Sequence, residues 1–341
     1  MKLVMTLLVR NEADIVDDHL AFHMASGVDF VIAADNVSTD GTTEILEKYA
    51  RNRQLHRISL PDPFSQIEVV TQMARLAATR FGADWVINSD ADEFWWPRAG
   101  TLKEVLSAVP PRFGSVRGMW RNFVPRPASD GWFAERMTIR SQRPVDELHP
   151  LNTHFKTIHR ASPDVEVGGG NHDAIGRGLA PLYGWYPIDV LHFPIRSLAH
   201  FERKFMRWWQ ITSVEGEATN PFYNRIRDAH REGRLAELYA SYVVDDEELA
   251  RGLADGTLVE DTRLRDALRS LRSDAPRLEL RDSDIDPGYL TEFGYLEDHG
   301  PFARAQRRID ALEARLSHVE RGIPVRLSRR LNPSVATLSH R

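Results

Sequence analysis

The most informative part of the chain is Ala83-Asp84-Trp85-Val86-Ile87-Asn88-Ser89-Asp90-Ala91-Asp92. Its apolar, β-branched run is typical of a buried strand, and this strand ends at two carboxylates, Asp90 and Asp92. Open α/β sheets bind ligands at the carboxyl ends of their strands. Because hard cations such as Mg²⁺ and Mn²⁺ prefer oxygen ligands and are often completed by substrate phosphates, the segment predicts a metal–diphosphate site. An acidic turn is the alternative, since Asp is common in turns.

The residues before this segment alternate between strand-like and helix-like patterns. Strands are expected over residues 3–9, 29–34 and 54–60, and helices over residues 13–26, 43–50 and 65–80. This alternation with short connections favours a parallel sheet in a three-layer α/β domain.

Polar side chains follow the first two expected strands. Asn11 and Glu12 come after the first strand, and Asp35 comes at the end of the second. The carboxyl ends of parallel strands meet at one edge of a sheet, so we expect these side chains near Asp90. Asp35 offers a carboxylate to a ribose or a base, although an Asx-type turn that caps the next helix is the favoured explanation of this loop taken alone.

Two later segments add titratable groups. A strand expected over residues 189–196 carries His192 and Arg196, and the helix after it carries Lys204. His192 could complete a metal shell with the two aspartates, and the two cations could neutralise a departing diphosphate.

The glycine-rich segment Gly168-Gly169-Gly170-Asn171-His172-Asp173 is a further candidate. Glycines let a backbone approach a ligand closely. We therefore consider Asp173 as a catalytic base and His172 as an alternative metal ligand, although a flexible hairpin loop explains the same glycines.

Other conspicuous side chains have a packing explanation. His19 and His23 stand four residues apart but lack the Glu of a zinc-hydrolase motif, so we interpret them as packing residues. Four tryptophans around the acidic motif could stack on sugar rings or belong to the core; they are Trp95, Trp96, Trp120 and Trp132.

In order and spacing, these motifs resemble family 2-type glycosyltransferases of the GT-A fold. The resemblance rests on residues 8–12, 23–29, 35–42, 90–94 and 190–197. It covers roughly residues 1–210, and the motif Asp90-Ala91-Asp92-Glu93-Phe94 is similar to that of a subgroup with a D-x-D-E-F motif. The E-D pair that supplies the base in typical family 2 enzymes has no clear match.

The resemblance implies an α/β, GT-A-like three-layer sandwich with a mostly parallel sheet and a helical C-terminal extension. It implies a nucleoside-diphosphate sugar as donor, with Asp35 at the nucleoside. It also implies Mn²⁺ or Mg²⁺ held by Asp90 and Asp92 and completed by His192. The expected reaction transfers the sugar to a hydroxyl of a saccharide or another acceptor, with inversion.

Under this interpretation residues 1–214 form the transferase domain, with a nucleotide-binding half at 1–98 and an acceptor half at 99–214. Residues 215–300 are expected to form a helical extension. Residues 301–341 are expected to form a C-terminal helix that could mediate homo-oligomerisation and a basic tail that could touch an anionic membrane.

Composition agrees with an ordinary protein of mixed α/β class. Charged residues are 27% of the chain and the net charge is −5, so no general attraction to nucleic acid is implied. The chain has no cysteine, which fits a reducing compartment, and the apolar run at residues 3–9 is too short to span a membrane. We expect a cytoplasmic protein, either free or at the inner face of the membrane.

Two other functions fit paired aspartates on such a sheet. A nucleotidyltransferase should carry a glycine-rich, basic phosphate loop after the first strand, and residues 9–14 lack glycine and are acidic. A non-catalytic sugar-nucleotide-binding or scaffold protein would not require an intact acidic pair.

Overall fold

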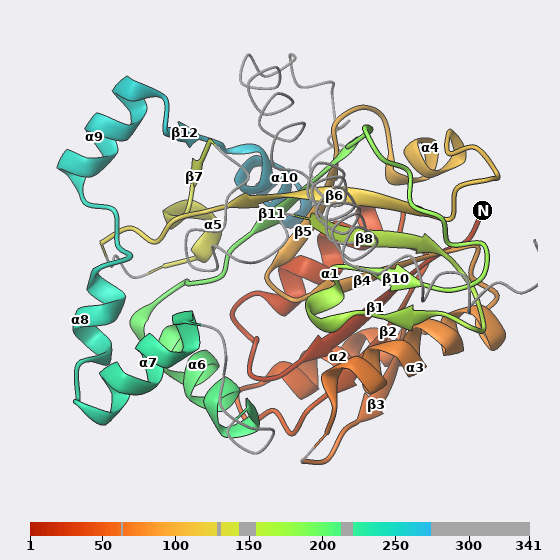
Figure 1. Ribbon diagram of the computed structural model, residues 1–341, viewed down its shortest axis with the longest axis horizontal. Coiled ribbons are helices and arrows are strands. Elements are labelled where there is room, and N and C mark those ends of the chain that lie inside the picture. The colour runs from red at the N-terminus through yellow and green to blue at the C-terminus, as the bar shows by residue number, and fades with distance from the viewer. Residues whose placement is uncertain (63, 128–130, 143–154, 213–220, 274–341) are drawn as a thin grey trace, which may run out of the picture. The chain divides into compact units, whose positions relative to one another are not determined.

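A computed structural model describes residues 1–62, 64–127, 131–142, 155–212 and 221–273, all within one compact unit, Met1–Ile285. Its centre is an eight-stranded sheet in the order β3-β2-β1-β4-β8-β6-β11-β5 (Figure 1). The strands of this sheet are β1 (Leu3–Val9), β2 (Phe30–Asp35), β3 (Leu55–Ser59), β4 (Trp85–Asp90), β5 (Glu93–Pro97), β6 (Ser115–Asn122), β8 (Phe155–Arg160) and β11 (Ile188–His192).

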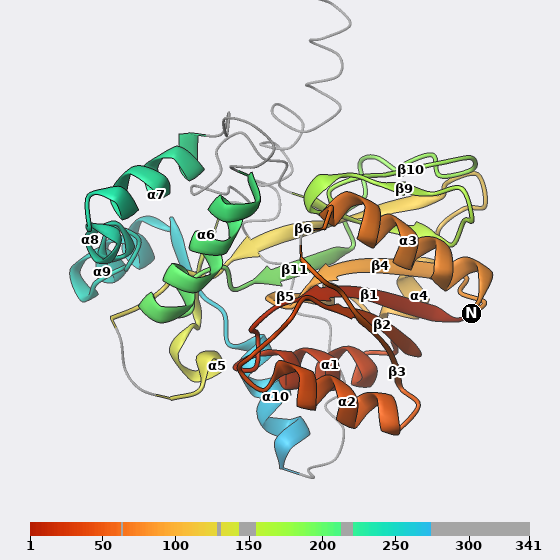
Figure 2. The same cartoon turned by 90° about the horizontal axis from the view of Figure 1, so that it is seen from below.

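The first half of the sheet is parallel, as the alternating pattern predicts. Strands β3, β2, β1 and β4 pair in parallel and are joined by α1 (Val16–Ala25), α2 (Thr42–Arg51) and α3 (Gln66–Thr79). Figure 2 shows α1 and α2 on one face of the sheet and α3 on the other. The N-terminus of α3 is capped by Ser65, whose hydroxyl accepts a hydrogen bond from the backbone N–H of Glu68.

Because helices cover both faces, β1, β2 and β4 are buried on both sides, whereas the edge strand β3 is only partly buried. In β1, Leu3, Met5 and Leu7 pack into the core beneath α1 and α2. Val4, which points to the opposite face, packs with residues of α3 such as Val70. Alternate residues of β1 thus pack into two separate hydrophobic cores, one on each face of the sheet.

The second half of the sheet is mixed. Strand β8 is antiparallel to both β4 and β6, β11 is parallel to β6, and β5 is antiparallel to β11. The register of β11 sets His192 opposite Glu93 on one side and Asn122 on the other. A strand nearly a hundred residues later in the chain therefore returns to the acidic motif. The expected α/β, GT-A-like fold class is confirmed.

Strand β11 and the elements around the sheet complete the described fold. The expected strand over residues 189–196 is shorter than predicted and ends at His192, before Pro194, which lacks the N–H that a strand needs. The remaining elements are α4 (Leu102–Ser107), α5 (Phe133–Arg136), β7 (Ile139–Ser141), β9 (Glu166–Val167), η1 (Gly169–Asn171), β10 (Ala174–Ile175), α6 (Leu198–Thr212), α7 (Pro221–Arg231), α8 (Leu235–Ala240), α9 (Asp246–Asp255), β12 (Leu258–Glu260) and α10 (Arg263–Arg272).

The segment after α6 makes many contacts with the rest of the compact unit, among them those of α7 and α8 with α6. Strand β12 pairs with β7, and α10 packs against α1 and α5. The proposed domain boundaries stay predictions, and residues 301–341, with the expected C-terminal helix and basic tail, lie outside the described residues. Among the helices that the structure describes, none is long and apolar enough to cross a membrane.

Candidate active site

The acidic motif occupies the tight connection between β4 and β5, at the carboxyl end of the parallel strands. Asp90 is the last residue of β4, and Glu93 is the first residue of β5. The backbone carbonyl of Asp92 accepts a hydrogen bond from Phe193, which ties the motif to the end of β11. The motif is therefore held on both sides by the central sheet.

A buried lysine from β8 neutralises one side of the motif. Lys156 is 1% exposed, and its Nζ lies 2.8 Å from Asp90 Oδ2 and 2.7 Å from Glu93 Oε1. Glu93 also accepts hydrogen bonds from the Trp120 indole N–H and from the backbone N–H of Asp90. These contacts fix the turn that presents Asp90.

Burial raises the pKa of Glu93 from 4.5 to about 8. The carboxylates of Asp90 and Asp92 act in the same direction as burial, and together these effects outweigh Lys156, which lowers the pKa. For Lys156, burial lowers the pKa, but Asp90 and Glu93 outweigh burial and hold it above its usual range. The lysine is thus charged at neutral pH, and Glu93 can retain its proton.

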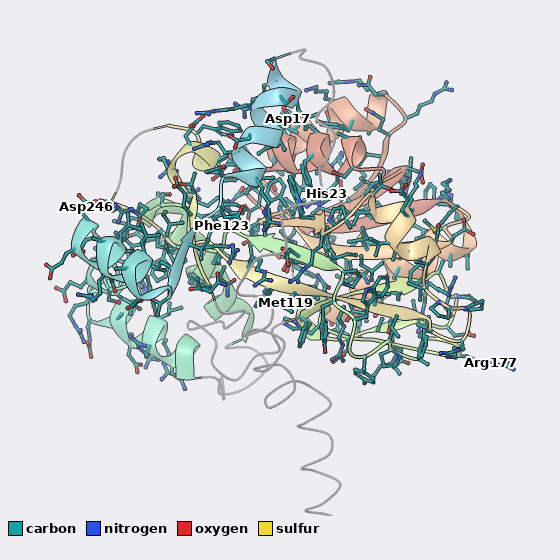
Figure 3. All side chains as sticks on the ribbon, turned by 90° about the horizontal axis from the view of Figure 1, so that it is seen from above. Asp17, His23, Met119, Phe123, Arg177 and Asp246 are labelled. Atoms are coloured by element: carbon teal, nitrogen blue, oxygen red, sulfur yellow. The ribbon has the colours of Figure 1, made fainter. Side chains whose placement is uncertain are left out.

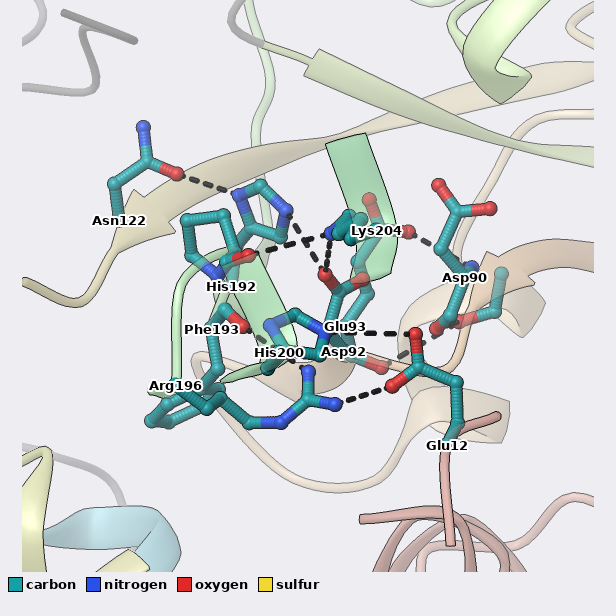
Figure 4. Close-up of polar contacts among 12 residues, drawn as sticks. Glu12, Asp90, Asp92, Glu93, Asn122, His192, Phe193, Arg196, His200 and Lys204 are labelled. Atoms are coloured by element: carbon teal, nitrogen blue, oxygen red, sulfur yellow. Dashed lines mark hydrogen bonds and ion pairs between the residues drawn. The ribbon is translucent and has the colours of Figure 1, made fainter. Parts of the chain in front are cut away.

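Asp92 faces a second lysine and a histidine (Figure 4). Lys204 Nζ lies 2.5 Å from Asp92 Oδ2, and His192 Nε2 lies 3.8 Å from the same oxygen. Burial acts to raise the pKa of Asp92, but Lys204, His192 and Arg196 together hold it well below its usual range. Asp92 is therefore a carboxylate throughout the physiological range.

The orientation of His192 is set by neighbours on β6. Its ring stacks on the Trp120 indole at 4.5 Å, and Nδ1 lies 2.7 Å from Asn122 Oδ1. Because an amide oxygen only accepts hydrogen bonds, Nδ1 carries the proton, and in a neutral ring the lone pair is on Nε2. That nitrogen faces Asp92, as a metal ligand would require.

The donor chemistry at this point suits a divalent cation, though no complete shell is formed. Within the described ranges, no group of three or more acidic or histidine side chains is arranged to hold a metal ion. A carboxylate and an imidazole 3.8 Å apart can nevertheless share a cation, because each bond would be near roughly 2 Å. Asp92 and His192 fit such an ion, which a phosphate-bearing ligand would have to complete.

Arg196, expected near the diphosphate, is engaged in a buried ion-pair network. It is 1% exposed and pairs with Glu12 and with Asp14, whose Oδ2 lies 2.7 Å from Arg196 Nε. His200 Nε2 lies 3.7 Å from Glu12 Oε1. This network joins the loop after β1 to the start of α6 (Figure 4), and Arg196 interacts electrostatically with Asp92.

Asn11 connects the loops after β1 and β2, and Asp35 stabilises the second of these loops. Asn11 Oδ1 accepts a hydrogen bond from the backbone N–H of Thr39 at 2.8 Å. Asp35 is buried, and its carboxylate accepts from Ser38 N–H at 3.2 Å and from the Thr43 hydroxyl at 2.5 Å. Asp35 Oδ2 also lies 3.9 Å from the guanidinium of Arg57 on β3. Its contact with a nucleoside stays a prediction.

The glycine-rich segment reaches the acidic motif through Asn171, whose amide nitrogen lies 3.3 Å from Asp90 Oδ1. Gly170 has a φ of +64°, and a Cβ there would lie 2.9 Å from the His172 ring. The loop therefore requires glycine at this position. The His172 ring packs edge-on against Trp120 at 5.3 Å.

Asp173, the candidate base, pairs with Arg117 at 3.1 Å, and the side chain of Asp173 is 53% exposed. Both residues line a cavity of about 490 Å³, together with Thr157 of β8 and Tyr183. Asp173 thus opens onto a space whose lining contains neither Asn171 nor a residue of the acidic motif.

The packing interpretation of His19 and His23 agrees with their burial. Both are fully buried, and His23, labelled in Figure 3, accepts a hydrogen bond from the backbone N–H of Trp95 at 3.0 Å. Trp95 and Trp96 also lie in the core. These residues support the motif from the interior.

Sequence reasoning missed several residues of the site. Lys156 and Asn122 come from strands β8 and β6 that no local motif marks, and Asn171 was not separated from its glycine-rich segment. Glu93 follows the acidic pair directly, so its position beside Asp92 was the signal that could have identified it.

Comparisons with known proteins bear on this site. Residues 5–215 match the sequence model of glycosyltransferase family 92. The chain is similar to S. aureus TarS 1-349, with 14% identity, a TM-score of 0.35, and coverage of 61% of this chain and 66% of that one. For the same protein in complex with UDP, the identity is 14% and the TM-score is 0.37, and the match covers 84% of this chain and 95% of that one.

A third similar structure is glucosyl-3-phosphoglycerate synthase from Mycobacterium tuberculosis in complex with Mn²⁺, UDP-glucose and phosphoglyceric acid. Its identity is 20%, its TM-score is 0.25, and the match covers 35% of this chain and 44% of that one. No curated protein matches the chain.

Proposed function

The chain belongs to glycosyltransferase family 92, and from this membership and the geometry of the site we propose that it is a metal-dependent enzyme that moves a sugar from a nucleoside-diphosphate sugar to an acceptor hydroxyl. The enzyme class expected from the sequence, a glycosyltransferase, is confirmed. Assignment to the subgroup with the D-x-D-E-F motif stays a prediction, as does inversion at the transferred carbon.

The observation that carries the proposal is an excess of carboxylates at the sheet edge. The cluster contains three cations and five carboxylates, and it remains negative even when Glu93 is protonated. A diphosphate would be repelled by such a cluster unless a divalent cation came with it. The carboxylates are Glu12, Asp14, Asp90, Asp92 and Glu93, and the cations are Lys156, Arg196 and Lys204.

In the proposal, Mn²⁺ or Mg²⁺ is held by Asp92 and His192, with Asp90 on the open side of the motif. Such an ion acts as a Lewis acid that stabilises charge on the departing diphosphate. Lys204 adds a positive charge beside the departing diphosphate, and Lys156 keeps Asp90 and Glu93 in position. His172 is the alternative metal ligand.

The remaining roles are proposals of the same kind. Asp35 would contact the nucleoside, with Asn11 and Glu12 shaping the donor side, and Asp173 would take the proton from the acceptor hydroxyl. The acceptor is a saccharide or another hydroxyl compound. We propose a cytoplasmic location, which the absence of cysteine favours.

The test is turnover of a panel of nucleoside-diphosphate sugars with Mn²⁺, followed as release of nucleoside diphosphate. We expect activity in the full chain, a loss of at least about a hundredfold in Asp92→Asn, and no loss in Asp84→Asn. Asp84 is a matched control, because it lies at the opposite end of β4 and its side chain is 60% exposed. Full activity in Asp92→Asn, or equal activity after chelation of metal, would refute the proposal.

A further inference from the structure

The acidic motif contains two lysines that are held in different ways. Lys156 pairs with two carboxylates, lies 5.1 Å from the centre of the Trp120 ring, and its side chain is 2% exposed. Lys204 pairs with one carboxylate, that of Asp92, and its side chain is 28% exposed. Lys156 is thus built into the fold, whereas Lys204 has solvent beside it and a flexible stem that can move.

Lys204 stands where a divalent cation would bind. Its Nζ lies 2.5 Å from Asp92 Oδ2, the same oxygen that lies 3.8 Å from His192 Nε2. An ion shared by Asp92 and His192 would have to use that oxygen. An ammonium and a divalent cation on one carboxylate oxygen would lie within a few ångströms of each other and repel strongly.

The other interactions of Lys204 are weaker than its ion pair with Asp92, and they include an electrostatic attraction to Glu12. Apart from Asp92, it lies 3.4 Å from the backbone carbonyl of Pro194, a long and weak contact. Lys204 lies near the middle of α6, so a change of side-chain rotamer moves the ammonium without moving the sheet. The neighbouring Arg196 cannot replace Lys204 as a mobile cation, because it is buried against Glu12 and Asp14.

We propose that Lys204 is an exchangeable counter-ion of Asp92: the divalent cation displaces its ammonium, which then pairs with the diphosphate of the nucleotide. The inference rests on the proposed function and adds a consequence to it. When the metal binds alone, the Lys204 ammonium loses its ion pair with Asp92 and gains no other partner. When the metal binds with a nucleotide, the ammonium gains the diphosphate as a new anionic partner. Metal and nucleotide therefore bind cooperatively, and Lys204 is the source of part of that coupling.

The test is binding of Mn²⁺ to the full chain, measured from the electron paramagnetic resonance signal of free Mn²⁺, without nucleotide and with UDP or GDP. For Lys204→Met we expect Mn²⁺ alone to bind about tenfold tighter than to the wild type, because a competing charge is gone. We also expect the enhancement of Mn²⁺ affinity by nucleotide to fall by about tenfold. Lys204→Arg, which keeps the charge, should retain most of the enhancement.

The matched control is Lys103→Met. Lys103 is an ion-paired lysine of similar exposure, 34%, at 2.6 Å from Asp29, and its replacement should change neither quantity. Unchanged or weaker binding of Mn²⁺ alone to a folded Lys204→Met variant would overturn the inference while leaving the proposed function intact. A wild type that binds no Mn²⁺ even with nucleotide would overturn the proposed metal site itself, and the inference with it.

Discussion

Replacement of Lys156 by methionine tests whether this lysine holds the acidic motif through Glu93. At pH 6 Glu93 keeps its proton, because its pKa is raised to about 8, and the variant loses mainly the ion pair with Asp90. Loss of one hydrogen bond to a charged group costs about 1–3 kcal/mol. The free energy of unfolding should therefore fall by that amount at pH 6.

The cost of Lys156→Met should grow at higher pH. A raised pKa means that the contribution of Glu93 to stability is greatest below pH 4.5 and is lost as the pH rises through about 8. Without Lys156 the pKa of Glu93 moves higher still, so above pH 8 the folded variant binds more protons than the folded wild type. Its stability then falls faster, by up to about 1.4 kcal/mol per pH unit.

Urea denaturation at pH 6 and pH 9.5 measures both quantities. We expect a cost of about 1–3 kcal/mol at pH 6 and about 2 kcal/mol more at pH 9.5. In the double variant Lys156→Met/Glu93→Gln the extra cost at pH 9.5 should vanish. An equal cost of the single variant at both pH values would show that Lys156 does not hold the motif through Glu93.

Three further predictions address the fold and the metal. Asp189→Asn should lower the free energy of unfolding by about 3–5 kcal/mol, because its buried carboxylate pairs with three arginines at 2.8–3.2 Å; chemical denaturation checks this. His192→Ala should weaken nucleotide binding in the presence of Mn²⁺ and leave metal-free binding nearly intact in calorimetry, whereas a purely structural histidine would lower the melting temperature alone. Gly170→Ala should cost about 1–3 kcal/mol in the same denaturation assay, because its φ of +64° is strained for alanine.

The parallel half of the fold was predictable because β1, β2 and β4 are largely apolar runs and because helical patterns separate its four strands. In β1 and β4 both faces are buried, so the runs are nearly unbroken. The capped start of α3 at Ser65 was equally readable. Asp90 and Asp92 could be placed at the ligand edge for the same reason, since a strand that ends in two carboxylates is a local signal.

The second half of the sheet could not be predicted in this way. Strand β8 enters between β4 and β6 in antiparallel orientation, and nothing in its short sequence indicates that neighbour. Lys156 therefore appeared only in the structure. The same holds for Arg196, whose pairing with Glu12 and Asp14 depends on how the loop after β1 meets the start of α6. Long-range pairing of charges leaves no periodic pattern in a sequence.

In the proposed site, Asp92 and a divalent cation together bind the nucleoside diphosphate. Calorimetry of UDP and GDP, with and without Mn²⁺, measures this directly in the wild type and in Asp92→Asn. We expect Mn²⁺ to tighten binding of one of these nucleotides to the wild type by at least about tenfold, and to have little effect in the variant. Equal nucleotide affinity of the wild type with and without Mn²⁺ would contradict the account.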